Sequence, residues 1–504
     1  MRRARLTALA GAVAACALLL PTGAGAAGPV RHLRLGSLEL HRCGQGLPGY
    51  CGSLSRRLDP ALKHGPRIKI GFQWLPPHGK AKGPALVAVE GGPGYPSSGS
   101  DFEYQGIFSP LIGSRGLLLV DQRGTGMSGL IDCKKLQNFV GRTSGPAFAK
   151  RVAACATQIE RRHPHVHAAD LFGTAYAADD LAAVLRATRL GKVDLYGDSY
   201  GTWFVQSFIA RHPDTVRSVT LDSAYPVVGL DPWYASSGPV ARGALDAVCA
   251  RDLACAAAAP GTATDRLAQL LDKLRAAPIT GAARDSDGAP ARARVTVRTI
   301  VDLVQDAASD PVIYRELDPS VRAALAGDNV PLLRLAVQSG TYDHGASPAS
   351  YFSDGLYWAV SCVDYPQLFS MTASPAQRRT QLAASLAAPP AGDPFAPFTS
   401  SEWVTMSAYD EPYMGCLDWP KPAHQAPPVP PGSQPLPASV PMLILGGDLD
   451  SLTPEPDVEK FGPTLGQHVR IVKLSNAVHV SSEGDTLLLG ATHCARQIVR
   501  AFVR

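Results

Sequence analysis

The feature that most constrains this sequence is the stretch 193–203, in which a short apolar run ends at a serine between two glycines and continues into a helical pattern. Ser199 lies between Gly197 and Gly201 in a GxSxG frame, whose small residues permit a strained turn that exposes the serine hydroxyl. Helical periodicity precedes this run, and 216–221 resembles another strand, a context that a glycine–serine surface loop would lack. The order predicts a mostly parallel sheet with helices on both faces.

The composition limits the classes of protein that this chain can be. With 504 residues, of which 45% are hydrophobic, it can bury a large core and still carry a substantial insertion. The formal charge is +5 and no long run of Lys and Arg is present, so nucleic acid is not an expected partner. We expect no transmembrane helix after the N-terminal segment, and the sequence does not reveal the oligomeric state.

The N-terminal segment 1–27 has the features of a secretory signal peptide. Three arginines precede the apolar run 6–20, and the small residues 24–26 offer a cleavage site. We therefore expect a secreted protein, extracellular or associated with the cell wall. Cys16 leaves a less favoured alternative, because its context resembles the signal of a lipoprotein that is anchored through an acylated cysteine.

Nine cysteines remain after the signal, an odd number for an oxidising compartment. The sequence alone does not establish their pairing, but pairing sequence neighbours is economical and leaves one buried thiol. No CxxC motif is present, which disfavours a zinc or redox site, and a metal site at the alternating histidines 163, 165 and 167 is a weak alternative. We expect no metal and no cofactor. The economical pairs are Cys43 with Cys51, Cys133 with Cys155, Cys249 with Cys255 and Cys362 with Cys416, leaving Cys494.

Two further strands are expected at 84–89 and 116–120, and both end in glycine-rich loops. The first of these loops could suggest a dinucleotide site, but Pro93 has no N–H for a phosphate and the spacing is not GxGxxG. The loop suits another task, since a glycine allows close approach of the backbone to a reacting carbonyl. We therefore expect the N–H groups of Gly92 and Tyr200 to form an oxyanion hole.

The rest of the chain divides into core and insertion. We assign 28–225 to the first part of an α/β core, 226–430 to a mostly helical lid, and 431–504 to the last part of the core, while weaker strand signals occur within 31–80. Strands are expected at 442–445 and 468–474, and each is followed by a loop with polar residues.

These late loops hold the side chains that a serine nucleophile needs. A serine hydroxyl requires a base within hydrogen-bond reach, and the base requires an acceptor on its other ring nitrogen. His479 and Asp450 suit these roles with Ser199, because all three follow predicted parallel strands and therefore lie at one sheet edge. Asp448 competes with Asp450 for the role of the acid.

Several motifs together resemble one family. Gly-Gly-Pro-Gly at 91–94, Asp-Gln-Arg-Gly-Thr-Gly at 121–126 and Gly-Asp-Ser-Tyr-Gly-Thr-Trp at 197–203 are similar to those of α/β-hydrolase peptidases. With Asp-Ser-Leu-Thr-Pro at 450–454 and Cys-Leu-Asp-Trp-Pro at 416–420, the chain resembles the secreted tripeptidyl aminopeptidase and proline iminopeptidase group, including its C-terminal TAP-like domain. The resemblance implies an α/β-hydrolase fold and an acyl-enzyme formed on Ser199, with Asp450 as the acid and His479 as the base.

The substrate is less defined than the chemistry. An aminopeptidase needs carboxylates for the substrate ammonium, and the lid residues Asp364, Glu402, Asp410 and Glu411 are candidates by composition. Glu90 stands where proline iminopeptidases usually have a histidine. A peptide is the favoured substrate, a small acyl ester processed by a carboxylesterase is the alternative, and a non-catalytic binding protein on the same fold is a third reading.

Overall fold

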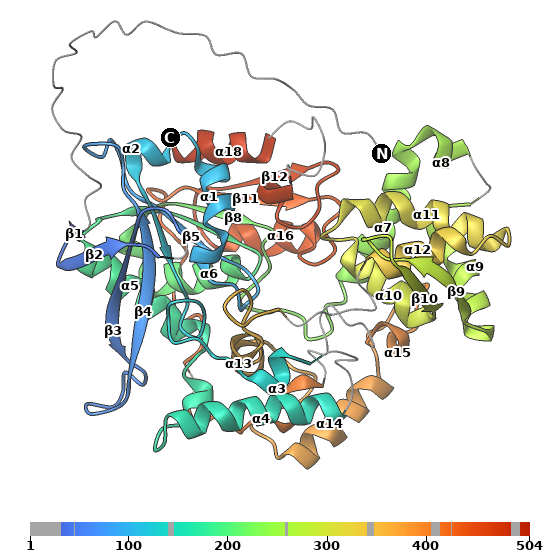
Figure 1. The fold of residues 1–504 in the computed structure, drawn as a ribbon, viewed down its shortest axis with the longest axis horizontal. Coiled ribbons are helices and arrows are strands. Elements are labelled where there is room, and N and C mark those ends of the chain that lie inside the picture. The colour runs from blue at the N-terminus through green and yellow to red at the C-terminus, as the bar shows by residue number, and fades with distance from the viewer. Residues whose placement is uncertain are drawn as a thin grey trace, which may run out of the picture.

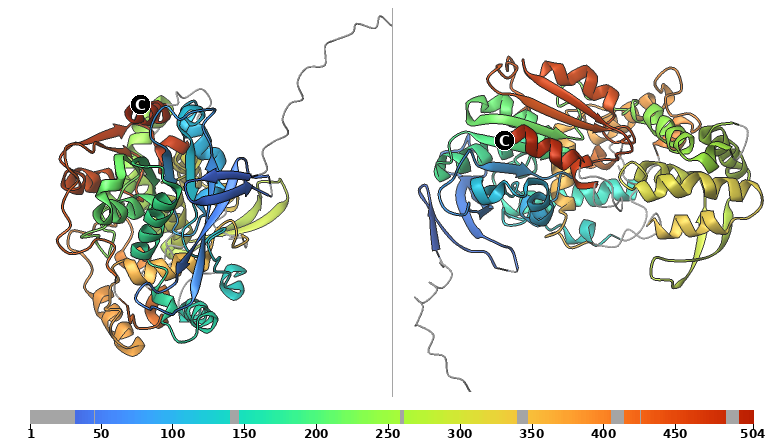
Figure 2. Two further views of the ribbon diagram at one scale, coloured as in Figure 1. Left: turned by 90° about the vertical axis from the view of Figure 1, so that its left-hand side faces the viewer. Right: turned by 90° about the horizontal axis from the view of Figure 1, so that it is seen from above.

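The computed structural model describes residues 32–44, 46–139, 146–257, 261–339, 347–404, 414–424, 426–484 and 494–504. The expected signal peptide 1–27, with Cys16, and the candidate residues Asp410 and Glu411 lie outside these ranges. In the views of Figures 1 and 2, a sheet with its helices occupies one end of an elongated molecule and a helical lobe occupies the other.

A ten-stranded sheet forms the core, in the order β1-β2-β3-β4-β6-β5-β7-β8-β11-β12. The pairs from β1 to β4 and the pair β4–β6 are antiparallel, and all later pairs are parallel. The expected α/β-hydrolase fold with a mostly parallel sheet is confirmed. The strands are β1 (His32–Leu35), β2 (Leu38–Arg42), β3 (Tyr50–Arg57), β4 (Arg67–Leu75), β5 (Leu86–Val89), β6 (Leu117–Val120), β7 (Val193–Asp198), β8 (Val216–Asp222), β11 (Met442–Gly447) and β12 (Val469–Leu474).

Helices cover both faces of this sheet because the strands in its middle are apolar on both sides. In β5, Leu86 and Ala88 face a cluster with α1 (Asp101–Phe108) and α18 (Cys494–Val503), whereas Val87 and Val89 face the larger cluster with α5 (Thr174–Thr188) and α6 (Tyr200–Arg211). This alternation follows from the two-residue period of a strand. It explains why the central strands are continuous apolar runs in the sequence.

The remaining helices belong to the connections, the insertion and the C-terminal part. They are α2 (Ile112–Arg115), α3 (Lys134–Gln137), α4 (Pro146–Arg162), α7 (Ser237–Arg251), α8 (Leu253–Ala257), α9 (Ala263–Ala276), α10 (Val297–Asp306), α11 (Pro311–Leu325), α12 (Val330–Gln338), α13 (Asp354–Asp364), α14 (Pro375–Ala387), α15 (Ser400–Trp403), α16 (Glu455–Phe461) and α17 (Ser481–Gly484).

The insertion has two parts. Helices α7 to α12 form the lobe at the right of Figure 1, whereas α13 and α14 lie with α3 and α4 below the sheet. The lobe also holds a hairpin of β9 (Ile279–Arg284) and β10 (Pro290–Val295), although the sequence analysis expected no strands there. The residues of both strands are mainly Ala, Gly and Arg, which have little preference for strands, so the tertiary contacts with α12 decide their conformation.

Four disulfides link the expected pairs Cys43–Cys51, Cys133–Cys155, Cys249–Cys255 and Cys362–Cys416. Such bonds are compatible with an extracellular location. The expectation of a buried thiol at Cys494 is wrong, since this residue is exposed. It is the first residue of α18, and the apolar face that this helix turns to the sheet begins only at Ala495. No helix within the described ranges has both the length and the apolar character needed to cross a membrane.

Candidate active site

Ser199 occupies the sharp turn between β7 and α6. Its backbone has φ 50° and ψ −122°, a strained conformation for a residue with a side chain. The turn is possible because its glycines pack closely: a Cβ on Gly197 would overlap the carbonyl of Gly201, and a Cβ on Gly201 would overlap the carbonyl of Val89. The Ser199 N–H also donates to Asp222 O at 3.0 Å, which holds the turn against β8.

His479 and Asp450 lie beside this serine, as the sequence analysis expected. His479 Nε2 is 2.8 Å from Ser199 Oγ, and His479 Nδ1 is 2.9 Å from Asp450 Oδ2. Asp450 follows β11 and His479 follows β12, so the parallel strands bring both loops to the edge where β7 ends. The three side chains form one continuous hydrogen-bonded chain that can move a proton from the hydroxyl to the imidazole.

Charge and burial act in opposite directions on the pKa values of Asp450 and His479. Burial raises the pKa of Asp450, but the adjacent His479 and the hydroxyl and N–H of Thr453 outweigh burial and lower that pKa below its ordinary value. Burial lowers the pKa of His479, but the Asp450 carboxylate outweighs it and raises that pKa above its ordinary value. Asp450 is therefore ionised at neutral pH and stabilises an imidazolium at His479.

In the loop after β11, Asp448 and Asp450 have different partners. Asp448 does not contact the imidazole: its Oδ1 accepts from Asn476 N at 2.7 Å and its Oδ2 pairs with Arg251 at 2.5 Å. Thr453, which the sequence analysis did not single out, donates its hydroxyl to Asp450 Oδ2 at 2.6 Å. Its position three residues after the acid is the signal that could have identified it, because a turn hydroxyl commonly binds a preceding carboxylate.

Of the two residues expected to form an oxyanion hole, Gly92 lines the cavity at Ser199, and Tyr200 directly follows Ser199 in the chain. Tyr200 is the first residue of α6, so its N–H has no carbonyl of its own helix to bind. Gly92 lines the cavity with Ser199 and His479 and has φ 109°, which a residue with a side chain rarely adopts. Gly91 packs so closely that a Cβ on it would lie 2.9 Å from Ser199 Cβ.

A cavity of about 660 Å³ opens at Ser199 and His479. Its walls come from the core, from the insertion and from the loop after β11, and they combine aromatic side chains with polar ones. A cavity of this size accommodates several residues of a peptide or a large acyl group. The aromatic lining residues are Tyr225, Tyr234, Tyr357, Trp358, Tyr365, Trp403 and Phe461.

Of the carboxylates expected to bind a substrate ammonium, the two within the described ranges, Asp364 and Glu402, do not line this cavity. Asp364 accepts from the N–H and hydroxyl of Thr174 at 2.7 and 2.5 Å and does not line the cavity, and Glu402 is paired with Arg275 at 2.8 Å. Two other acids, Asp231 and Asp457, line it instead. They were missed because the tertiary arrangement of the segment after β8 and of α16, and not a local motif, brings them to the cavity.

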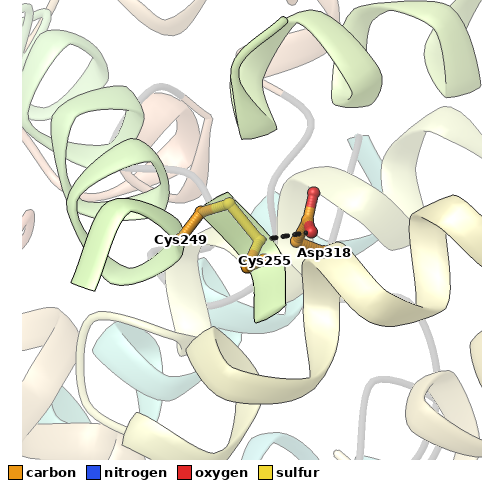
Figure 3. A group of neighbouring side chains, drawn as sticks. All are labelled: Cys249, Cys255 and Asp318. Atoms are coloured by element: carbon orange, nitrogen blue, oxygen red, sulfur yellow. Dashed lines mark hydrogen bonds between the residues drawn. A yellow bond between two sulfur atoms is a disulfide. The ribbon is translucent and has the colours of Figure 1, made fainter. Parts of the chain in front are cut away.

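Two groups of side chains within the described ranges have the spacing to hold a metal ion. One combines Cys249, Cys255 and Asp318 (Figure 3), but its cysteines form a disulfide and have no thiolate to offer a metal. Asp318 is also paired with Arg266 at 2.7 Å. The other group consists of Glu90, Asp198 and Glu483, directly behind the nucleophile turn.

Comparisons with known proteins agree with this architecture. The model of the α/β hydrolase fold matches residues 84–238, and the model described as TAP-like protein matches residues 400–504. The chain therefore has the fold of the α/β hydrolases. More particularly, the last part of the chain, after the insertion, is similar to TAP-like proteins.

One curated relative is Putative hydrolase YuaR of Escherichia coli (strain K12), which is 24% identical over 256 residues. The match covers 47% of this chain and 50% of that protein, so the chain spans about half the length of this relative. Among solved structures, proline iminopeptidase of Mycobacterium smegmatis has 13% identity and a TM-score of 0.35, with 90% of this chain and 97% of that chain covered. A thermophilic esterase of Thermogutta terrifontis has 13% identity and a TM-score of 0.34, with 90% and 98% covered.

Proposed function

We propose that this protein is a secreted serine aminopeptidase that cleaves short units from the N-terminus of peptides. Ser199 attacks the scissile carbonyl while His479 takes its proton, and the imidazolium, stabilised by Asp450, then protonates the leaving amine. The N–H groups of Gly92 and Tyr200 stabilise the oxyanion. Water, activated by the same imidazole, then hydrolyses the acyl-enzyme.

The observation that carries the hydrolase chemistry is the chain of hydrogen bonds from Ser199 through His479 to Asp450, at 2.8 and 2.9 Å, beside a cavity. The peptidase assignment is supported by the TAP-like match and by the acids of the cavity. Asp457 is half-buried and accepts the Ser236 hydroxyl at 2.6 Å, which leaves its other oxygen for a substrate ammonium.

A carboxylesterase is the second candidate, and one observation favours it. Most of the cavity wall is aromatic or aliphatic, while Asp364 and Glu402 are engaged elsewhere. An apolar acyl group would fill such a cavity without any charged partner.

Matched substrates separate the two candidates. Peptide amides with a free and with an acetylated N-terminus are compared with p-nitrophenyl esters of short fatty acids. The peptidase proposal expects cleavage of the free peptides and loss of at least about tenfold in kcat/KM on acetylation, equivalent to one lost charged contact. Equal rates with both peptides, combined with faster ester cleavage, would support the esterase.

Asp457→Asn tests the proposed ammonium contact. We expect KM for free peptides to rise by about tenfold or more, because an amide retains the shape but loses the charge. The same variant should leave ester cleavage nearly unchanged. Glu402→Gln is the matched control, since Glu402 is paired with Arg275 outside the cavity lining and its loss should not alter KM.

A further inference from the structure

A tyrosine hydroxyl joins two carboxyl groups behind the nucleophile turn. Tyr104 Oη lies 2.8 Å from Glu90 Oε2 and also 2.8 Å from Asp198 Oδ1. A phenol has one hydrogen and can donate it to only one of these oxygens. The second short contact therefore needs another proton, carried by one of the carboxyl groups.

The surroundings favour keeping that proton. Asp198 is 1% exposed, and the carboxyl oxygens of Glu90, Asp198 and Glu483 lie within 4.8 Å of one another. Burial, Glu90 and Glu483 raise the pKa of Asp198 well above its ordinary value, and burial, Glu90 and Asp222 do the same for Glu483. Two adjacent carboxyl groups in such a site share a proton, as in other carboxyl dyads.

The elements packed around this group add little compensating charge. Glu103 from α1 and Asp222 from the end of β8 bring further negative charge towards Glu483. Arg496 of α18 is the cation that acts on Glu483, and its effect on the pKa is smaller than those of burial and the nearby acids. Tyr196 and Tyr95 also adjoin the group, and their hydroxyls stay protonated because burial raises both pKa values.

The two bridged carboxyl groups belong to the two loops that must meet for catalysis. Asp198 directly precedes Ser199, and Glu90 directly precedes the glycine loop, where its Oε1 accepts from Gly91 N at 3.0 Å. Gly91 in turn packs against Ser199. The bridge through Tyr104 therefore connects the nucleophile with the loop that holds Gly92.

We propose that a proton shared by Asp198 and Glu90 through Tyr104 holds the glycine loop against the nucleophile turn, and that loss of this proton at alkaline pH separates them and lowers the reactivity of Ser199. Asp198, Glu90 and Tyr104 are thus positioning residues. This inference rests on the proposed role of Ser199 as the nucleophile.

The test measures the rate at which a fluorophosphonate inactivates the protein as a function of pH, since this probe has no ammonium group that could titrate. For the unsubstituted protein we expect the rate to fall at alkaline pH. In Asp198→Asn and Glu90→Gln, the new amide group can donate a hydrogen bond to Tyr104 and does not lose a proton at alkaline pH. The alkaline fall of the inactivation rate should therefore move to higher pH by at least about one pH unit. Tyr104→Phe breaks the bridge at every pH, so it should slow inactivation about tenfold to a hundredfold at neutral pH and abolish the alkaline limb.

Glu103→Gln is the matched control, because it removes a nearby carboxylate outside the bridge and should leave the limb in place. Thermal unfolding at neutral pH identifies any variant that fails to fold, and having both Asp198→Asn and Glu90→Gln keeps the test available if one of them does. An unchanged alkaline limb in the folded variants would overturn the proposal.

Infrared spectroscopy provides a readout that does not depend on Ser199. At neutral pH the unsubstituted protein should show the C=O stretch of protonated carboxyl groups. Asp198→Asn or Glu90→Gln should remove the band of the bridge, which the difference spectrum between the unsubstituted protein and each variant isolates. Absence of this band in the unsubstituted protein would overturn the proposal that Asp198 and Glu90 share a proton. A band that is present in a protein whose Ser199 does not react with the fluorophosphonate would instead overturn the proposed function, and with it the positioning role.

Discussion

Each of the three residues in the proposed triad has its own role, and Ser199 supplies the nucleophilic hydroxyl. Ser199→Ala removes the hydroxyl that His479 Nε2 contacts at 2.8 Å, so we expect turnover to fall by several orders of magnitude, up to ~10⁶. His479→Ala should be as severe. Circular dichroism should show an unchanged fold, and a variant that retained most of its activity would contradict the assignment.

The two aspartates of the loop after β11 provide a matched pair of substitutions. Asp450→Asn replaces an acceptor of His479 Nδ1 with a group that no longer stabilises the imidazolium, and we expect kcat to fall by about 10⁴-fold. Asp448→Asn should lower kcat by less than about tenfold, because Asp448 binds Asn476 and Arg251 and not the imidazole. The opposite ranking would exchange the roles of the two acids.

The pH dependence of the reaction follows from the pKa of His479. This residue must be neutral to accept the proton of Ser199, and Asp450 raises its pKa above the ordinary histidine value of about 6.5. We therefore expect the acid limb of kcat/KM for an ester substrate to lie above that value. In Asp450→Asn the residual activity should show a limb at lower pH, because the charge that raised the pKa of His479 is gone.

At the scale of elements, a carboxyl group joins the insertion to the core. Asp364 at the end of α13 accepts from Thr174 at the start of α5, and burial raises the pKa of Asp364 to about 6. The folded protein therefore binds this proton more tightly than the unfolded chain, so this carboxyl lowers stability as pH rises from its ordinary value through about 6.

We accordingly expect Asp364→Asn to gain stability relative to the unsubstituted protein as pH rises, by an amount on the order of 1–3 kcal/mol. Thermal unfolding at pH values below and above this range measures the effect. Glu402→Gln should show the opposite trend, because the hydrogen bond from Arg275 lowers the pKa of Glu402 and its stabilisation is lost only in acid. If the stability of both variants changed with pH in the same way, the pKa shifts of Asp364 and Glu402 would not be the cause.

The elements differ in how much their sequence reveals. The central strands β5, β6, β7 and β11 were predicted because burial on both faces favours runs of mainly apolar residues. The region 31–80 contains four strands, although its sequence carries only weak strand signals, since β1 and β2 are short and largely exposed. The residues of the triad could be predicted because each follows such a strand, whereas Asp231 and Asp457 reach the cavity only through packing of distant elements.

At the scale of the whole molecule, the lobe of the insertion contacts the two loops that carry Asp450 and His479, the acid and the base of the proposed triad. Ala308, which follows α10, accepts the His479 N–H at 2.7 Å, and Tyr314 of α11 donates its hydroxyl to Leu449 O at 3.0 Å. Both contacts lie next to the proposed base and acid. The lobe therefore helps to hold the geometry of the triad and is more than a cover for the substrate.

Tyr314→Phe tests this role of the lobe. The substitution leaves the buried carbonyl of Leu449 without its hydroxyl donor, which costs about 1–3 kcal/mol of the contact between lobe and core. Hydrogen exchange measured by mass spectrometry should speed up in 448–452 and in α11, and kcat should fall several-fold. Arg251→Ala removes a half-exposed ion pair from the same interface and should have a smaller effect on exchange, because solvent already screens that pair. If Tyr314→Phe changed neither exchange nor kcat, the lobe would serve only to enclose the cavity.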